Sequence, residues 1–226
     1  MSLILPAYNE ETSISGVVSG LVKVLQKHSN QFELIVVDNG STDETRGVLK
    51  KLQEQMTELR VVEVMQNQGY GHGILEGFRA SSGDVVGWCD ADGQTMPDDI
   101  MHVYQCMENM GADFAKGCRY GRSDGFFRTL ESRTFNQTFR FLFGIAVKDI
   151  NGKPKFMQRN LYEKMQLTSK DWFIDAECIL KAHKNGVEVL DVEIQSVPRR
   201  NGKSKIRVSS MFEFFKNLLG YKLRGY

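Results

Sequence analysis

Two carboxylates separated by one residue are the clearest chemical signal in this sequence. Asp90 and Asp92 directly follow the apolar run 85–89, and Gln94 adds an amide oxygen two residues later. Carboxylates at this spacing after a strand can both reach one cation, and Mg²⁺ and Mn²⁺ prefer oxygen ligands that they share with substrate phosphates. The pattern predicts a metal site for a phosphate-bearing substrate. An acidic turn is the alternative, because Asp and Gly are common in turns.

An aromatic and an acidic residue follow the first apolar run. Residues 6–10 read Pro-Ala-Tyr-Asn-Glu and come directly after the apolar residues 2–5. Tyr8 could stack on a nucleobase, and the carboxylate of Glu10 could accept hydrogen bonds from a base or a ribose. The alternative is a helix start with Asn9 as its cap and the acid at the positive end of the helix dipole. A helix start is expected in either case.

Asp38 ends the second strand-like run, residues 32–37. An Asp at the carboxyl end of a parallel strand can bind ribose hydroxyls or the edge of a base. The alternative is a turn that leads into a helix, whose first turn Ser41 and Glu44 would close as a capping box. The residues leave both interpretations open.

Glycines are concentrated in residues 67–73, which read Asn-Gln-Gly-Tyr-Gly-His-Gly. Glycine lets the backbone approach a ligand closely, and an ordinary glycine-rich turn is the alternative. The dinucleotide-binding pattern G-x-G-x-x-G does not hold in either register, because its third glycine is replaced by Ile74 when counted from Gly69 and by Glu76 when counted from Gly71. A Rossmann dehydrogenase therefore loses support.

The elements that must position these segments alternate between strand and helix. Short, continuously apolar runs separated by helical periodicity are typical of a parallel sheet covered on both faces. Such sheets bind ligands at the carboxyl ends of their strands. Strands are expected at residues 2–5, 32–37, 60–65, 84–89, 113–117 and 187–194, and helices at 10–26, 41–56, 71–80, 97–109, 133–144, 175–185 and 211–224.

Length and composition fit one soluble domain. The 226 residues are 41% hydrophobic and 25% charged, which is an ordinary balance. No apolar run approaches the roughly 20 residues of a membrane-spanning helix, and we expect no signal peptide at the amino end. Without a CxxC pair, the four cysteines are expected to be reduced thiols of a cytosolic protein.

Charge is unevenly distributed, although the formal net charge is only +1. Residues 199–226 contain eight Lys or Arg and a single acid, Glu213, whereas the part of the chain before them has more acids than bases. A mildly acidic body with a basic tail predicts an anionic partner near the carboxyl end.

In order and spacing, the four polar segments resemble the motifs of the family 2 inverting glycosyltransferases with the GT-A fold. Residues 6–10 are similar to the family's opening motif, and residues 37–43 to its D-x-x-S-x-D segment. Residues 67–71 resemble its N-x-G-x-G loop, and residues 90–92 its DXD metal motif. The resemblance covers about residues 2–120. It implies an α/β fold of GT-A type, with a mostly parallel central sheet flanked by helices.

The second half resembles the dolichol-phosphate mannose synthase-like branch of that family, whose acceptors are polyprenyl phosphates. Arg119 lies in a segment similar to the branch's G-x-R motif. Arg133 lies in the aromatic-rich helix where the branch carries an arginine. Residues 199–205 match its R-x-x-G-x-S-K motif, a basic loop that can fold over a pyrophosphate.

One segment departs from that branch. Where the branch has D-x-x-S/T-G-F-R, Gly152 takes the hydroxyl position and Lys153 the glycine, while Pro154 and Lys155 replace the aromatic residue and the arginine. The role of Lys155 is therefore open. The chain also lacks a Q-x-x-R-W motif, so a processive cellulose or hyaluronan synthase is not expected.

The resemblance implies a nucleotide-sugar donor with GDP or UDP, and Mg²⁺ or Mn²⁺ as the cofactor. Asp92 and Gln94 would be metal ligands, with Asp90 bridging to the ribose or the metal. Arg119 and Arg133 would bind the acceptor phosphate, so the implied catalytic residues are Asp90, Asp92, Arg119 and Arg133. The implied donor-binding residues are Pro6, Tyr8, Glu10, Asp38, Gly71, Asp90, Ala91, Arg199 and Lys205.

The acceptor decides whether a general base is needed. A sugar hydroxyl must lose a proton, whereas a lipid phosphate is already an anion. The resemblance favours transfer to a polyprenyl phosphate. A saccharide or protein hydroxyl as acceptor, and a catalytically silent nucleotide-sugar binding module, are the alternatives. No nucleic-acid partner is expected, and neither the sugar nor the oligomeric state follows from the sequence.

The tail, residues 206–226, is expected to form an amphipathic helix. Such a helix can lie in a membrane interface, which would place the protein peripherally at the cytoplasmic face of the membrane. Packing against the domain is the alternative. The whole chain is expected to be one domain, 1–226, in which a nucleotide-binding half (1–120) and an acceptor-side half (121–205) precede the tail helix. The apolar face comprises Val208, Met211, Phe212, Phe214, Phe215, Leu218, Leu219 and Leu223, flanked by Lys216, Lys222 and Arg224.

Overall fold

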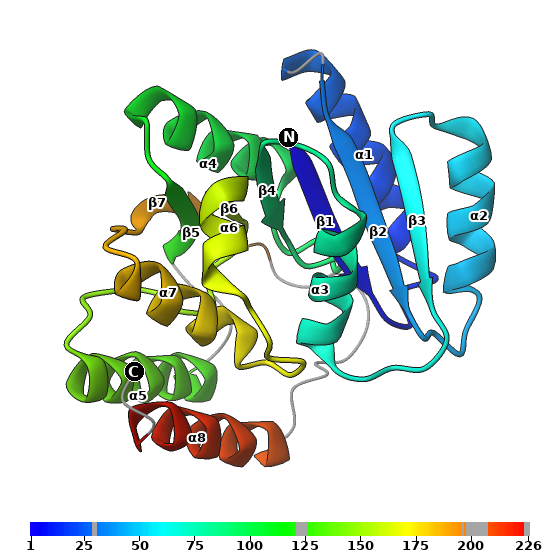
Figure 1. The fold of residues 1–226 in the computed structure, drawn as a ribbon. Coiled ribbons are helices and arrows are strands. Elements are labelled where there is room, and N and C mark those ends of the chain that lie inside the picture. Colours follow the sequence, from blue (N-terminus) through cyan, green and yellow to red (C-terminus); the bar gives the residue numbers. More distant parts are fainter. Residues whose placement is uncertain (29–30, 121–125, 196, 198–207, 224–226) are drawn as a thin grey trace.

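A seven-stranded sheet forms the centre of the fold (Figure 1). The computed structural model describes residues 1–28, 31–120, 126–195, 197 and 208–223, and of residues 126–133 and 208–215 it describes the backbone alone. The strand order is β3-β2-β1-β4-β6-β5-β7. The strands are β1 (Ser2–Ala7), β2 (Glu33–Asn39), β3 (Leu59–Val64), β4 (Val85–Trp88), β5 (Phe114–Tyr120), β6 (Lys155–Gln158) and β7 (Leu190–Gln195).

Strand direction brings the polar segments together. β1 runs parallel to β2 and β4, and Ala7 lies opposite Asp38 in the β1–β2 register. β6 is antiparallel to both β4 and β5, so β5 has the same direction as β4. The carboxyl ends of β1, β2, β4 and β5 therefore lie along one edge of the sheet. Strand β3 is parallel to β2, so the four polar segments, which follow β1, β2, β3 and β4, lie along this edge.

Helices cover both faces of the sheet, as Figure 1 shows. Helices α1 (Ile14–His28), α2 (Thr45–Gln55) and α4 (Pro97–Met110) pack on one face, and α3 (Tyr70–Ala80), α6 (Arg159–Met165) and α7 (Ile174–Lys184) on the other. Helices α5 (Phe126–Phe143) and α8 (Val208–Leu223) lie side by side beyond α7. The expected mostly parallel sheet flanked by helices is confirmed.

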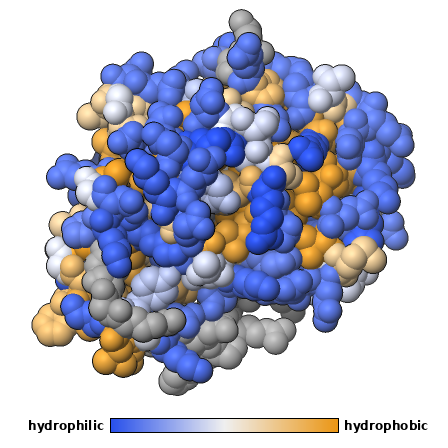
Figure 2. Space-filling model, viewed as in Figure 1, coloured by the Kyte–Doolittle hydropathy of each residue, from blue (hydrophilic) through white to orange (hydrophobic). Residues whose placement is uncertain are grey.

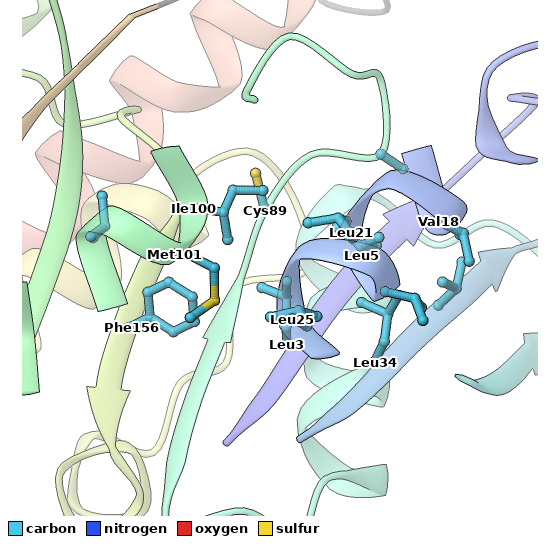
Figure 3. Packing of buried hydrophobic residues seen from close by; sticks show 14 of the residues in the cluster. Leu3, Leu5, Val18, Leu21, Leu25, Leu34, Cys89, Ile100, Met101 and Phe156 are labelled. Carbon is cyan, nitrogen blue, oxygen red and sulfur yellow. The ribbon is translucent and has the colours of Figure 1, made fainter. Parts of the chain in front are cut away.

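Strand residues alternate between the two cores, because successive side chains of a strand point to opposite faces. Leu3, Leu5 and Leu34 face α1, where Figure 3 shows them against Leu21 and Leu25. The residues between them along β1 and β2 belong to the second core, under α3, α6 and α7. Both faces are buried, which explains why these strands read as continuous apolar runs.

Two expectations about local structure need correction. Strand β6 and helix α6 were not predicted, because β6 is only four residues long and begins with a charged residue, Lys155. The capping box, which was part of the alternative interpretation of the turn before α2, is not formed, since no side-chain hydrogen bond caps that helix. The Ser41 hydroxyl accepts instead from the backbone N–H of Asn9 at 3.0 Å, and the Asp43 carboxylate accepts from the N–H of Thr45 at 3.0 Å.

The amphipathic tail helix is present as α8 and packs on the domain. Leu218 is fully buried in a cluster with residues of α5 and α7. Asn217 donates to the Asp171 carboxylate at 2.7 Å, and the Tyr221 hydroxyl donates to Glu177 at 2.7 Å. Leu223, in contrast, is 86% exposed. The described part of α8 therefore both packs and presents apolar side chains to solvent.

Three exposed apolar side chains, Phe141, Leu219 and Leu223, lie near the ends of α5 and α8, while Met65, Met110 and Tyr120 are exposed elsewhere on the surface. Leu219 is largely exposed, as is Phe141 near the end of α5. In Figure 2 hydrophobic surface appears at the lower left, where these helices end in Figure 1, and also at the centre and right of the same face. None of the described helices is long and apolar enough to cross a membrane.

Two glycines inside helices have opposite surroundings, which gives a test of the packing. A Cβ at Gly77 of α3 would collide with the buried side chain of Ile4, whereas a Cβ at Gly16 of α1 would meet nothing within 4 Å. Gly77→Ala should lower the free energy of unfolding by about 1–3 kcal/mol, because the core is overpacked. Gly16→Ala should raise it by about 0.5–1 kcal/mol, because alanine favours the helix. Urea midpoints that move in the same direction would contradict this packing.

Candidate active site

The turn after β4 carries both carboxylates of the predicted metal motif. The β1–β4 pairing extends to Cys89, whose N–H donates to the carbonyl of Ile4 at 3.0 Å. Asp90 Oδ1 accepts from the Tyr70 hydroxyl at 2.6 Å, and Asp90 Oδ2 lies 3.4 Å from Lys153 Nζ. Two protein donors thus fix the orientation of the Asp90 carboxylate.

Asp92 and Gln94 continue the same turn. Asp92 Oδ1 accepts from the backbone N–H of Gln94 at 3.0 Å. The backbone carbonyl of Gln94 accepts from the N–H of Val197 at 3.1 Å, and its side-chain amide donates to the Val197 carbonyl at 3.4 Å. Val197 therefore holds the metal-motif turn in place.

A small pocket lies beside this turn, between the ends of β4 and β5. Acidic, amide and basic groups converge on it, in reach of one bound molecule. Its lining residues are Asp90, Gln94, Thr95, Arg119, Asn151, Lys153 and Ile194. The structure thus brings together Asp90, Gln94 and Arg119 as the sequence predicted, and adds Lys153, which the sequence reasoning did not assign.

Arg119 enters the pocket already paired. Its Nε and Nη2 donate to the two carboxylate oxygens of Asp149 at 2.8 and 2.9 Å, a bidentate geometry that fixes the guanidinium plane. Behind it, the buried Lys116 donates to the carbonyl of Asp149 at 2.7 Å and pairs with Asp191 at 2.7 Å. These contacts tie β5, β7 and residues 144–151 into one rigid wall.

Three charged side chains are buried next to the pocket. Asp175, in the first turn of α7, is 1% exposed and lies between two lysines. Lys155 Nζ pairs with its Oδ1, and Lys153 Nζ lies 3.2 Å from its Oδ2. Lys155 also donates to the carbonyl of Ile150 at 3.0 Å and lies over the Trp88 ring. The structure thus gives Lys155, whose role the sequence left open, a buried ion pair.

Burial and pairing act in opposite directions on these groups. Burial alone would raise the pKa of Asp175, but Lys153 and Lys155 together hold that pKa below its ordinary value. Burial lowers the pKa of Lys155, with Asp175 opposing the shift. For Lys153 burial is outweighed, because Asp175 and Asp90 raise its pKa. Lys153 is therefore a charged ammonium group at the pocket.

Hydrogen bonds join the two predicted nucleoside-binding segments at the ends of β1 and β2. Asn9 adopts a left-handed conformation (φ 52°), which Asn tolerates, and its side chain accepts from the N–H of Thr42 at 2.8 Å. The Asp38 carboxylate is fully buried and accepts from the N–H of Ser41 at 3.0 Å and from Arg46 Nε at 2.8 Å. Asp38 thus stabilises the turn after β2, as one of its two interpretations predicted. Contact between Asp38 and a nucleoside stays a prediction.

Glu10 has the helix-start role that was one of its two interpretations. Its carboxylate accepts from the Ser13 hydroxyl at 2.7 Å, and its backbone carbonyl accepts from the N–H of Ile14 at 2.9 Å. Its own N–H donates to the hydroxyl of Thr45 at 2.8 Å. Tyr8 and Glu10 are both partly exposed at the same edge of the sheet, so contact with a donor stays a prediction for both.

The glycine-rich loop packs tightly against the protein's own chain. A Cβ at Gly71 would collide with the carbonyl of Ser169, and the N–H of His72 donates to the carbonyl of Lys170 at 2.9 Å. Next to these contacts in the chain, the Tyr70 ring stacks on the Trp172 ring, with centroids 4.2 Å apart. The close approach that the glycines permit is thus to residues 169–171, and a ligand contact of Gly71 stays a prediction.

Three predicted residues cannot be placed. Arg199 and Lys205 lie outside the described residues, and Arg133 lies in α5 where only the backbone is described. The sequence reasoning in turn missed Lys153 and Tyr70. One signal was available for Lys153. It stands two residues before Lys155, and side chains at this spacing share one face of an extended segment.

Comparison with known proteins identifies relatives. The family model of Glycosyl transferase family 2 matches residues 2–168. An undecaprenyl-phosphate 4-deoxy-4-formamido-L-arabinose transferase from Pseudomonas fluorescens is 29% identical over 208 residues, covering 91% of this chain and 60% of that protein. The enzyme of the same name from Pectobacterium atrosepticum is 27% identical over 222 residues, or 97% of this chain and 66% of that protein. This chain therefore spans less than two thirds of the length of either relative.

Solved structures share the fold. Glucosyl-3-phosphoglycerate synthase from Mycobacterium tuberculosis, in complex with Mn²⁺, UDP-glucose and phosphoglyceric acid, superposes with a TM-score of 0.77 at 23% identity. The match covers 98% of this chain and 79% of that protein. The same enzyme with phosphoglyceric acid alone gives a TM-score of 0.76 at 22% identity, over 97% and 78% of the two chains. The GT-A-type fold expected from the sequence is confirmed.

Replacing the buried carboxylate tests the charge cluster. Asp175→Asn should lower the free energy of unfolding at pH 7 by about 3–5 kcal/mol, because two buried lysines lose their counterion. The folded-state pKa of Asp175 lies below its unfolded value. Its contribution is therefore present above pH about 4 and is lost as the pH falls further, so wild type and variant should converge in acid.

Urea unfolding from pH 7 to pH 3 measures both effects. Glu54→Gln removes an exposed acid from α2 and serves as the control, with an expected change under about 0.5 kcal/mol. Equal stability of wild type and Asp175→Asn at pH 7 would show that Asp175 does not stabilise the lysines.

Proposed function

This chain belongs to glycosyl transferase family 2, and from that premise we propose that it transfers a sugar from a nucleotide-diphosphate donor to a polyprenyl phosphate. The observation that carries the proposal is the pocket in which Asp90 of the metal motif meets two cations, Arg119 and Lys153. A site that joins a metal-bound diphosphate to an anionic acceptor needs this combination. The undecaprenyl-phosphate transferases among the relatives support the same acceptor class.

The donor set fits a divalent cation that is shared with the substrate. Asp92 and Gln94 offer hard oxygen ligands, and we assign both as ligands of Mg²⁺ or Mn²⁺. Asp90 would contact the ribose or the metal, and the ribose is favoured because the neighbouring Lys153 ammonium would repel a cation. Among the described residues, no group of three or more His, Cys, Asp or Glu could hold a metal ion by itself. Mg²⁺ typically binds one or two carboxylates together with substrate phosphates, which suits this site.

The donor would lie along the carboxyl ends of β1, β2 and β4. Tyr8, Glu10 and Asp38 would hold the nucleoside, with Pro6, Gly71 and Ala91 shaping the surface between them. Arg199 and Lys205, beyond the described residues, would close over the diphosphate. UDP is supported by the structural relatives that bind UDP or UDP-glucose, and GDP by the branch resemblance.

The chemical step is a displacement at the anomeric carbon. An oxygen of the acceptor phosphate forms the new bond, and the bond from the anomeric carbon to the β-phosphate oxygen of the donor breaks. The nucleoside diphosphate leaves with the bonding electrons, and Asp92 and Gln94 would hold the divalent cation that stabilises its charge. Because the attacking oxygen is already anionic, no proton has to be removed. Arg119 and Arg133 would bring this anion to the donor.

The pocket is less suited to a saccharide or protein hydroxyl as the acceptor. Such an acceptor needs a general base. Asp90 is held by Lys153, Asp149 by Arg119, and the pKa of Asp175 is lowered by its lysines. Each of these carboxylates would have to give up an ion pair to accept a proton. The arrangement therefore favours an acceptor that arrives without a proton to lose.

The tail helix supports peripheral attachment to the membrane that carries the acceptor. Leu219 and Leu223 are exposed on α8, and so are Lys216 and Lys222. Apolar side chains can enter the interface of a bilayer while lysines contact anionic lipid headgroups. We place the enzyme at the cytoplasmic face, where nucleotide sugars are available.

An acceptor assay tests the proposed function. Purified protein with Mn²⁺ and a panel of UDP- and GDP-sugars should release nucleoside diphosphate only when a polyprenyl phosphate is present. The same panel with soluble saccharides is the comparison. Turnover with a saccharide and none with the lipid would establish the hydroxyl-acceptor alternative, and donor binding without turnover for any acceptor would establish a binding module.

Metal dependence is tested separately by donor binding. Asp92→Asn should weaken Mn²⁺-dependent binding of the preferred nucleotide sugar by at least about tenfold, because loss of even an outer-shell partner costs a metal site this much. Asp98→Asn, an exposed acid in the first turn of α4, is the matched control and should bind normally. Calorimetry with and without Mn²⁺ measures both. Metal-independent binding in wild type would refute the assigned site.

A further inference from the structure

Lys153 is a buried cation that the family motifs do not account for. Its side chain is 8% exposed, yet it lines the pocket together with Arg119 and Asn151. Burying an ammonium group is costly unless it is paired, and Lys153 lies within ion-pair distance of both Asp90 and Asp175. Its surroundings indicate what its charge does.

The backbone at Lys153 is fixed by close packing on β5. The N–H of Gly117 donates to the carbonyl of Pro154 at 2.8 Å, and the N–H of Gly152 donates to the carbonyl of Asp149 at 2.9 Å. A Cβ at Gly152 would collide with the carbonyl of Gly117, so the two segments are in direct contact. Lys153 therefore projects from a rigid part of the chain.

The ammonium group is held by two acids with different tasks. Asp175 Oδ2 lies at 3.2 Å and Asp90 Oδ2 at 3.4 Å, while the ring of Tyr70 lies 5.0 Å away on another side. Asp175 is anchored from behind by Lys155 and is 1% exposed, so it cannot turn away. Asp90 belongs to the metal motif and is 35% exposed. When the donor binds, Asp90 would interact with the ribose or the metal. Its carboxylate would then neutralise less of the Lys153 charge on the side that faces the pocket.

We propose that Lys153 binds the phosphate group of the acceptor, and that Asp175 is the residue that positions it. The inference rests on the proposed function, and it adds a cation that neither the branch motifs nor the sequence assigned. Arg119 shares the pocket, and Asp149 uses the Nε and Nη2 side of its guanidinium, so Lys153 adds a second cation beside it. An ammonium group has three N–H donors, so Lys153 can hold Asp175 and still donate to a phosphate oxygen.

The test separates acceptor binding from donor binding. Lys153→Met keeps an unbranched side chain that is one atom shorter and removes the charge. It should raise KM for a short-chain polyprenyl phosphate by at least about tenfold, the ratio that a lost charge-assisted hydrogen bond produces. The Kd of the nucleotide sugar, measured by calorimetry without acceptor, should change less than about threefold. Lys153→Arg retains a cation and should recover most of the acceptor affinity.

Controls distinguish this role from a structural one. Lys181→Met removes a lysine of α7 that is 20% exposed and pairs with Glu177 at 2.8 Å but does not line the pocket. It should leave the acceptor KM unchanged in the fraction that is folded at the assay temperature. Lys153→Gln, whose amide can still donate to both acids, gives the same readout if the methionine variant does not fold.

The outcomes distinguish failure of the inference about Lys153 from failure of the proposed function. If wild type uses polyprenyl phosphate and the Met or Gln variant keeps a normal acceptor KM, the inference about Lys153 is overturned and the proposed function stands. A rise in donor Kd without a rise in acceptor KM would likewise overturn it, by assigning Lys153 to the donor diphosphate. Wild type without turnover on any polyprenyl phosphate would overturn the proposed function and this inference together.

Discussion

The buried carboxylate of Asp175 carries a constraint on which the active site depends. It neutralises Lys153 and Lys155, and all three side chains are at most 8% exposed. Without this carboxylate Lys155 would lose its ion-pair partner and Lys153 would keep only Asp90, which would strongly destabilise the fold. Because Asp175 lies on α7 and the lysines flank Pro154, the ion pairs join that helix to the antiparallel strand β6. The position of β6 between β4 and β5 sets the width of the pocket between their ends.

The pocket is rich in charge but balanced before any substrate arrives. Arg119 faces Asp149, Lys116 faces Asp191, and Lys153 is shared between Asp175 and Asp90. The ion pairs offset the desolvation cost of each charged group and hold the cations in fixed positions. Of these acids, Asp90 is the one that both lines the pocket and is assigned to the donor. The affinity of the pocket for an anion therefore depends on what the donor does to Asp90.

The sequence predicted the parts of this arrangement that are local. Continuous apolar runs identified the parallel strands, and the polar residues after them were correctly expected along one edge of the sheet. The contacts that fix the pocket join distant residues, such as Arg119 with Asp149 and Lys155 with Asp175. No periodicity encodes such pairs. Strand β6 escaped prediction for the same reason, because burial of its lysine makes sense only once the partner acid is in place.

The first turn of α7 connects the pocket to the tail helix. Asp175 and Glu177 are both buried, and residues two apart on a helix point in different directions. Asp175 faces the lysines beside the pocket, whereas Glu177 accepts from the N–H groups of Thr168 and Ser169 and from the hydroxyl of Tyr221 on α8. The sequence could explain both acids as helix-start residues, and the structure gives each a separate partner.

This arrangement has a consequence for a lipid acceptor. Helix α8 presents Leu219 and Leu223 to solvent while Tyr221 fixes it to α7. The same short helix therefore anchors the candidate membrane contact and the carboxylate that positions Lys153. A polyprenyl chain held at the bilayer and a phosphate held in the pocket would then be located by one rigid element. That rigidity lowers the entropy lost when the two ends of the acceptor bind together.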